Sequence, residues 1–403
     1  MSLAAIRRPP VPSASELIAR ARAMVPDIRA LAEETERNRA LFPHIVQRIR
    51  DAELLRTCRP REFGGFEYDG EVALRIALEI SAACASTGWT VNGAVSNGLS
   101  LAHWPIAAQR EIWADDADPF TFACFAPTGT AVPVAGGYRL TGRWSFASGC
   151  DLAEWGKLGA MIAAPGGEAP RAGAFFLLPV AECEIIDTWF VCGLCGTGSK
   201  DIAVNDVFVP AHRVLSFSDT RAGTTPGGHY HKNPIYRLPL LMLGASMLAS
   251  TAVGTAKGAL NAYLEMTGGR TTRGALAGGN LRMREFATVQ LRLAEAAAAV
   301  EAAELILLTD MREAHRKLAA GEEIAVADRI RVRRNQAYAT RLAVQAVEAL
   351  NAATGGAGLH LSNPVQRAWR DANAVARHVS LNWDAVGTMY GQYAFGLEPK
   401  GQY

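Results

Sequence analysis

The hydrophobic pattern divides the chain into three parts. Between residues 13 and 117 apolar side chains recur every three to four positions, which predicts helices. Over residues 118–217 the pattern changes to short alternating segments separated by glycine and proline, which is typical of strands. We therefore predict an N-terminal helical domain over 1–117, a central β domain over 118–217 and a C-terminal helical domain over 218–403.

The N-terminal part is expected to contain several helices. Residues 13–57 predict helix in two pieces divided near Pro43, and Pro26 predicts a kink or a later start because proline disturbs a helix interior. Residues 71–85 are strongly apolar and favour helix, although their alternation also allows a strand. A further helix should run from the Ala85–Trp89 junction to His103, and a short one over 106–114.

The central part predicts six strands in close succession. Such short, closely spaced strands suit a small β-barrel or sandwich better than a parallel βαβ sheet. The expected segments are 120–125, 138–144, 157–163, 173–178, 184–189 and 203–209.

The C-terminal part begins with an expected loop over 216–234, whose composition suggests a mobile cover for a pocket. Long alanine- and leucine-rich helices should follow and form a bundle. The predicted helices are 236–268, 282–318, 322–353, 362–378 and 380–394. The apolar positions expected to form a seam of this bundle include Leu291, Leu293, Ala294, Ala297, Ala298 and Leu305, together with Glu301.

Charge and cysteine content narrow the possible partners. The net charge of +2 and the lack of any lysine or arginine block argue against nucleic acid. The apolar stretch 239–256 is interrupted by glycine and hydroxyl residues, which favours a buried helix over a membrane span. Seven cysteines without a regular framework suit reduced thiols in a cytoplasm, so we expect a cytoplasmic protein without a membrane partner.

Two runs of small and hydroxylated residues are the first candidates for a ligand site. Residues 142–150 and 192–200 each lie at a strand end, where small residues let the backbone approach a planar ligand. Ser148 and Ser199 are the hydroxyls most suited to face it, and the alternative is that both runs are tight β turns. The glycine pattern at 193–198 leads into a strand rather than a helix, so it does not predict a Rossmann site.

Histidine and arginine provide further candidates, each with a structural alternative. His378 and His103 lie near helix ends, where they could act on a substrate oxygen or simply cap the helix. His229 forms an HxH pair with His231, but no third ligand completes a metal site, so no metal is predicted. Arg270 and Arg273 could hold phosphate or complement a helix dipole. Cys192 and Cys195 are interpreted as packing residues.

Several motifs in this order resemble the acyl-CoA dehydrogenase fold over nearly the whole chain. They are Arg59–Gly65, Trp144–Gly149, Gly196–Ser199 with Val207–Pro210, and Gly355–Gly358 followed by Arg370 and Asp371. This resemblance implies an α+β protein with an N-terminal helical domain, a central β-barrel and a C-terminal four-helix bundle. The usual glutamate base of the dehydrogenases is missing near the C-terminus, where Asp384 is the only acid, and His378 stands there instead.

A histidine at that place is similar to the flavin-dependent monooxygenases that share this fold. These are oxygenase components of two-component systems, similar to the hydroxyphenylacetate, steroid-phenol and dibenzothiophene oxygenases. The resemblance implies that a separate NAD(P)H-dependent reductase supplies reduced FMN, with FAD as the alternative. Reaction with dioxygen would then give a C4a-hydroperoxyflavin that hydroxylates an aromatic or heteroaromatic compound. An FAD-dependent acyl-CoA dehydrogenase-like enzyme, an N-hydroxylase of an amine or amino sugar, and a non-catalytic assembly protein are the alternatives.

The same resemblance assigns roles to particular residues and implies a homotetramer. His378, Ser148 and His103 would be catalytic, with His103, Trp89 and His229 contacting the substrate. The residues expected to hold the flavin are Trp144, Phe146, Ser148, Thr197, Ser199 and Arg270, with Gly355, Gly356 and Gly358 contributed by a neighbouring subunit.

Overall fold

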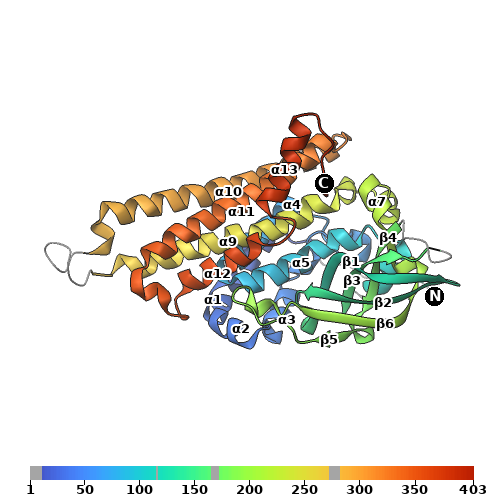
Figure 1. Ribbon diagram of the computed structural model, residues 1–403, viewed down its shortest axis with the longest axis horizontal. Coiled ribbons are helices and arrows are strands. Elements are labelled where there is room, and N and C mark those ends of the chain that lie inside the picture. Colours follow the sequence, from blue (N-terminus) through green and yellow to red (C-terminus); the bar gives the residue numbers. More distant parts are fainter. Residues whose placement is uncertain (1–10, 115–116, 165–171, 272–281) are drawn as a thin grey trace.

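The computed structural model describes residues 11–114, 117–164, 172–271 and 282–403. A bundle of long helices occupies one end of the molecule and a β-sheet the other (Figure 1). Helix α5 (Ala85–Leu101) lies between them and packs against both helix α9 of the bundle and strand β1. This helix is the element on which the candidate site is built.

The N-terminal part is helical, as predicted. Its other helices are α1 (Ala14–Ala30), α2 (Ala32–Asn38), α3 (Pro43–Asp51), α4 (Gly70–Ala83) and α6 (Ile106–Ile112). The ambiguous stretch is a helix because Asp69 caps it, accepting hydrogen bonds from the first backbone amides of α4. The later helix start predicted from Pro26 is wrong: α1 begins at Ala14, where Ser13 caps it, and continues through the proline.

The central part is one seven-stranded sheet. Its strands are β1 (Thr121–Val134), β2 (Gly137–Ala147), β3 (Trp155–Ile162), β4 (Ala172–Pro179), β5 (Glu184–Ile186), β6 (Lys200–Pro210) and β7 (Val214–Ser216). The order is β5-β6-β2-β1-β3-β4-β7, and only the β1–β3 pair is parallel among the described strands. Because this order has two ends, hydrogen bonding between the described strands does not close the sheet into the expected barrel.

The sheet has one face that forms a core of its own and a second face that the helices cover in part. One face forms its own core around Leu158, Ala160 and Phe176, which are fully buried. Leu177 points to the other face and belongs to the large helical core, since successive residues of a strand alternate between faces. The helices therefore cover the second face around β3 and β4, where a polar side chain is removed from bulk solvent, whereas Arg139, Thr141 and Arg143 of β2 are exposed.

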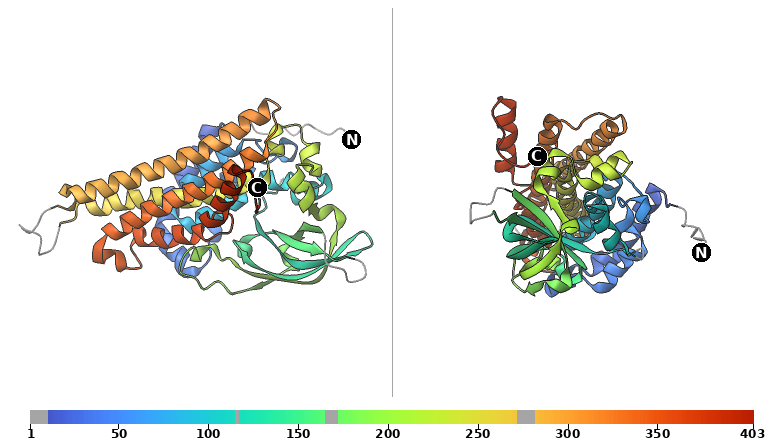
Figure 2. Two further views of the ribbon diagram at one scale, coloured as in Figure 1. Left: turned by 45° about the horizontal axis from the view of Figure 1, so that its top comes forward. Right: turned by 90° about the vertical axis from the view of Figure 1, so that its right-hand side faces the viewer.

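The C-terminal part contains the predicted long helices. They are α9 (Leu240–Gly268), α10 (Ala287–Ala319), α11 (Val326–Ala353), α12 (Pro364–Ala376) and α13 (Trp383–Ala394). Helices α9 to α12 pack together, while α13 projects from them (Figure 2). Within the described residues α9 is the one helix long and apolar enough to cross a membrane, but 72% of its most apolar window is buried inside the fold. It is a core helix, as predicted.

Two details of this part differ from the expectations. The predicted loop contains two short helices, α7 (Phe217–Ala222) and α8 (Pro226–Tyr230), because Ser216 and Thr225 cap their first turns. Most of the predicted bundle seam lies on the outer side of α10, where Leu291 and Leu305 are each 60% exposed, while Leu293 packs against the core. Within one chain, the interior of the bundle is instead formed by Val289, Ala296, Val300, Ala303 and Leu307.

Candidate functional site

Four side chains form a continuous hydrogen-bonded chain where α5, the end of β2 and the turn before β6 meet. They are Trp89, Ser148, Ser199 and Thr197. The Ser148 and Ser199 hydroxyl oxygens are 2.7 Å apart, and Ser199 is 2.6 Å from the Thr197 hydroxyl. Thr197 donates to the Leu194 carbonyl at 2.8 Å, and the Trp89 indole N–H donates to Ser148 at 2.9 Å. The two runs of small residues singled out in the sequence therefore meet at one place.

The directions of these bonds follow from the hydrogens available. Each hydroxyl has one hydrogen, and that of Thr197 is used on the Leu194 carbonyl. Ser199 must then donate to Thr197, and Ser148 must donate to Ser199. Every hydroxyl hydrogen is committed, so Ser148 has a lone pair left and no hydrogen. At this point the site offers a hydrogen-bond acceptor to a ligand.

Unusual backbone conformations hold the two turns together. Phe146 and Leu194 have positive φ angles of 68° and 55°, which are uncommon for residues with a side chain. The Gly149 amide donates to the Thr197 carbonyl at 2.8 Å and so joins the turns. Gly149 itself has a φ of 76°, and an added Cβ would lie 2.5 Å from a methyl carbon of Thr90. Strain of this kind often accumulates where a ligand binds.

His378, which follows α12, completes this group. Its ring lies 5.6 Å from the Trp89 ring, and the Ser380 amide donates to its Nδ1 at 3.2 Å. Burial, with a smaller contribution from the Arg333 charge, lowers the pKa of His378 to about 4. At neutral pH the imidazole is therefore uncharged, with its proton on Nε2, and can donate one hydrogen bond.

Helix α12 also positions the turn that carries Thr197 and Ser199. A carboxylate oxygen of Asp371 accepts from the Leu194 amide at 2.7 Å, and burial raises the pKa of Asp371 to about 6. Arg370 bonds the Cys192 carbonyl at 2.7 Å and pairs with Glu36. From the sequence, Arg370 and Asp371 could be recognised only as part of a motif. Their roles could not be predicted, because the backbone groups of Cys192 and Leu194 that they bind lie about 180 residues earlier in the chain.

Aromatic side chains border the site on its solvent side. Phe146 is 69% exposed and meets Trp189 edge to face, with their ring centroids 6.0 Å apart. Phe190 is 72% exposed, and the Arg39 guanidinium lies over its ring at 4.1 Å. Apolar faces next to a few placed polar groups are what a flat heteroaromatic ligand requires.

Three predicted residues lie elsewhere. Trp144 is 1% exposed within the sheet core, and its indole N–H donates to the Gly159 carbonyl, so it has no free face for a ring. His103 follows the opposite end of α5 from Trp89, roughly 20 Å along the helix axis. Its Nδ1 is 2.8 Å from the Thr225 hydroxyl, and burial lowers its pKa to about 4. His229 is exposed on α8.

Arg270 and the glycine turn lie together at the far end of the bundle. Arg270 donates to the Thr354 carbonyl at 2.7 Å and its guanidinium is beside Gly355. The length of α12 alone, about 20 Å, separates this turn from His378 of the same chain. The turn was expected to act on a neighbouring subunit, and Arg273 lies outside the described residues.

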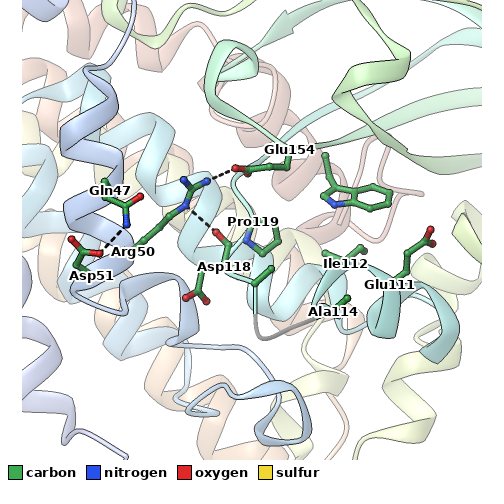
Figure 3. Close-up of a pocket in the computed structure, with 11 residues that line it drawn as sticks. Gln47, Arg50, Asp51, Glu111, Ile112, Ala114, Asp118, Pro119 and Glu154 are labelled. Atoms are coloured by element: carbon green, nitrogen blue, oxygen red, sulfur yellow. Dashed lines mark hydrogen bonds and ion pairs between the residues drawn. The ribbon is translucent and has the colours of Figure 1, made fainter.

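Other candidate sites have a structural explanation. All seven cysteines are free, and the described residues contain no group of three or more potential metal ligands. A crevice of about 530 Å³ lies beside α3 and α6 (Figure 3). Its charged lining is largely paired: Arg50 bonds Glu154 and the Asp118 carbonyl, and Gln47 bonds Asp51.

Comparison with known proteins gives the family. Residues 13–116 match the acyl-CoA dehydrogenase N-terminal domain, and residues 246–383 match the acyl-CoA dehydrogenase C-terminal domain. The oxygenase component of FADH(2)-dependent resorcinol hydroxylase from Rhizobium sp. (strain MTP-10005) is 47% identical over 392 residues, 96% of each chain. The chain belongs to the flavin-dependent monooxygenase oxygenase components of the acyl-CoA dehydrogenase fold.

Further relatives of this family agree. The flavin-dependent monooxygenase oxygenase subunit HsaA of Rhodococcus jostii (strain RHA1) is 35% identical, covering 93% of this chain and 97% of that protein. The crystal structure of HsaA from M. tuberculosis superposes with a TM-score of 0.91 at 32% identity, covering 97% and 99% of the two chains. XiaF from Streptomyces sp., in complex with FADH2 and glycerol, has a TM-score of 0.89 at 31% identity, covering 96% and 97%. The family and enzyme class expected from the motifs are confirmed.

Proposed function

We propose that this protein is a reduced-flavin-dependent monooxygenase that hydroxylates a phenolic compound, and that the site around Ser148 holds the flavin. The observation that carries this proposal is the direction of the hydrogen-bond chain, which leaves Ser148 with an acceptor and no donor. Reduced flavin carries an N–H at the N5 position of its central ring, whereas oxidised flavin has only an acceptor there. The site therefore suits the reduced form.

The residues present fit a flavin in other respects. Phe146, Trp189 and Trp89 supply apolar faces beside the hydroxyls, and the glycine-containing turns keep side chains away from a flat ring. A bound reduced flavin supplies the electrons with which dioxygen is activated. Ser148 would accept from the flavin N–H, and Ser199 and Thr197 would fix the Ser148 hydroxyl.

His378 is proposed to act as the hydrogen-bond and proton donor of the site. It is uncharged at neutral pH because burial opposes the imidazolium, and the Ser380 amide on Nδ1 leaves the proton on Nε2. The edge-to-face contact with Trp89 holds the ring beside the hydroxyl chain. A neutral donor can stabilise developing negative charge on oxygen without placing a permanent charge in a dry pocket.

We propose FADH2 as the flavin, although FMN was preferred from the sequence. The resorcinol hydroxylase named as FADH(2)-dependent is 47% identical, and the FADH2-bound XiaF is 31% identical. The FMN-bound structure of TdsC is only 20% identical. The printed name "oxygenase component" of the resorcinol hydroxylase supports a separate reductase as the source of reduced flavin.

We further propose a homotetramer, located in the cytoplasm. Helix α10 has an apolar stripe along one exposed side. It consists of residues spaced by three, four and seven positions, namely Leu291, Ala294, Ala298 and Leu305. Such a stripe is typical of a helix that packs against another, so a second copy would bury it. The cysteines, all unpaired, agree with a reducing compartment.

Anaerobic binding followed by turnover tests the flavin proposal. Dissociation constants would be measured for reduced FAD, reduced FMN and oxidised FAD, after which oxygen and resorcinol would be added and the product and hydrogen peroxide quantified. We expect reduced FAD to bind at least tenfold more tightly than oxidised FAD, with formation of a hydroxylated product. Tight binding of oxidised FAD together with acyl-CoA oxidation would favour dehydrogenase chemistry, and no flavin binding at all would leave a non-catalytic role.

A further inference from the structure

A buried lysine lies on the face of the sheet that is covered by α5. Lys157 of β3 is 3% exposed, and its side-chain nitrogen donates to the Ser100 hydroxyl at 2.8 Å and to the Asn97 side-chain carbonyl. No carboxylate among the described residues forms an ion pair with it. Burial alone lowers the pKa of Lys157 to about 7. Burying the charged form of an amine without a counter-charge is costly, so the position of Lys157 requires an explanation.

The surroundings of Lys157 are unusually free of charge. Helix α5 and strands β1 and β4, which pack around it, contain no aspartate, glutamate, arginine, histidine or other lysine. Cys124 is their single titratable side chain, and it is buried in the core on the opposite face of the sheet. Nothing on these neighbouring elements neutralises Lys157, so a ligand that brings an acidic oxygen would supply the counter-charge that they lack.

A stripe on α5 connects this lysine to the flavin site. Thirteen of the seventeen residues of α5 are buried, and the remaining four are Trp89, Gly93, Ser96 and Ser100, which share one face of the helix. A Cβ placed on Gly93 would meet no atom within 4 Å, so the middle of the stripe borders open space. One end of the stripe is Trp89, which donates to Ser148, and the other end is Ser100, which binds Lys157.

The distance along this stripe suits a small aromatic substrate. The Lys157 nitrogen bonds both Asn97, which is buried beside the stripe about 12 Å from Trp89 along the axis, and Ser100, which ends the stripe about 16 Å from Trp89. A reacting contact of roughly 3–3.5 Å, one aromatic ring and one hydrogen bond together span about 12 Å, which reaches the level of Asn97. Phe125 of β1 is 54% exposed and meets Phe175 edge to face at 5.3 Å, which adds apolar surface from the sheet.

We propose that Lys157, with Ser100 and Asn97, binds a phenolic hydroxyl of the substrate and takes up its proton. This inference rests on the proposed function and names the substrate group that the site recognises. The neutral amine accepts the phenol proton and becomes an ammonium, while the O–H electron pair remains on oxygen as a phenolate. The attraction between the ammonium and the phenolate in this buried place offsets the lower basicity of the amine. No oxidant or further reactant is required. The phenolate ring is richer in electrons, and is thereby prepared for hydroxylation at the Trp89 end.

The proposal is tested by binding before any turnover. Resorcinol is titrated into the anaerobic complex with reduced FAD at pH 7, and the ultraviolet difference spectrum reports phenol ionisation. We expect a phenolate signal with the native protein and its loss in Lys157→Met, whereas Lys257→Met on α9, which pairs with Glu304, should keep the signal. Dissociation constants for reduced FAD should agree within about twofold among the three proteins.

A second arm uses the native protein and keeps the test valid if Lys157→Met does not fold. Resorcinol, 3-methoxyphenol and 1,3-dimethoxybenzene have two, one and no free hydroxyls, each lost hydroxyl being replaced by a methoxy group, and the doubly methylated compound should bind at least tenfold more weakly. Equal binding of all three, or a phenolate signal that persists in Lys157→Met, would overturn the proposal. Both results would leave the proposed function intact as long as reduced FAD binds and resorcinol is hydroxylated. Failure of the native protein to bind reduced FAD would instead contradict the proposed function itself.

Discussion

A histidine lies near each end of α5, and only one of the two is beside the features expected of a flavin site. Burial lowers the pKa of His378, beside Trp89, and of His103, beyond the other end of the helix, to about 4. His378 lies next to a chain of hydroxyls and an open aromatic edge. His103 contacts Thr225, and its carbonyl accepts from the Gly227 amide at 3.1 Å.

This comparison shows that a perturbed pKa does not by itself identify a catalytic group. Both imidazoles are neutral because they are buried, so their pKa values cannot distinguish them. Their neighbours differ: His378 lies beside the hydroxyl chain and an exposed aromatic edge, whereas His103 is enclosed, and its Nε2 is buried without a hydrogen-bond partner among the described residues. His103 anchors the segment that contains α8, where an added Cβ on Gly227 would lie 1.8 Å from the Ala102 carbonyl oxygen. We therefore propose a catalytic role for His378 and a structural role for His103.

The largest expected effect is on product formation in His378→Asn. Removal of a general acid or hydrogen-bond donor lowers rates by about 10²–10⁴-fold, so hydroxylated product should fall by at least 100-fold while hydrogen peroxide rises. Reduced FAD should still bind within a few-fold of native affinity. His44→Asn, at an exposed histidine of α3, is the matched control and should retain native yield. Unchanged coupling of oxygen use to product in His378→Asn would remove this residue from the mechanism.

Ser148→Ala should have the next largest effect, on flavin selectivity. Loss of one placed hydrogen bond costs about 1–3 kcal/mol, which corresponds to roughly 5-fold to 150-fold in affinity. Because Ser148 offers only an acceptor, the loss should fall on reduced FAD and leave oxidised FAD nearly unchanged. Anaerobic titrations of both redox forms measure this. An equal loss for both forms would contradict the assigned direction of the hydrogen-bond chain.

His103→Asn should act on stability rather than on chemistry. The loss of the Thr225 contact should cost about 1–3 kcal/mol of unfolding free energy, with product yield per bound flavin within about threefold of native. Its pKa is lowered in the folded state, so this histidine contributes stability above pH 6.5 that is lost as the pH falls towards 4. The variant should therefore lose less stability than the native protein between pH 6.5 and 4 in denaturant titrations. A 100-fold loss of product yield would instead restore His103 to the catalytic group.

Asp371→Asn should give the smallest and most pH-dependent change. Burial raises the pKa of Asp371 to about 6 in the folded protein, so its charge lowers native stability as the pH rises from about 4 to 6 and above. Asparagine keeps an oxygen for the Leu194 amide without that charge. Melting temperatures of variant and native protein should converge near pH 4, and the variant should be equal or higher at pH 7. If the variant melted below the native protein at pH 7 but not at pH 4, the assignment of the raised pKa to burial would be contradicted.

Several features of this protein follow from local sequence alone. The order of helices, strands and bundle was predicted because apolar periodicity and capping residues such as Asp69 act over a few positions. The turns containing Ser148 and Ser199 were also found, since glycine and serine at strand ends determine local backbone shape. Motif order over the whole chain was enough to predict the family.

Only the tertiary structure decided which side chains meet. Trp144 and Phe146 are two residues apart on one strand, yet one is in the core and the other in solvent because a bulge shifts the β2–β6 register between Trp144 and Ala147. Lys157 looks like an ordinary strand lysine until β3 is placed under α5. The contact of Trp89 with His378 joins positions 289 apart, and such pairings depend on how elements pack rather than on any local pattern.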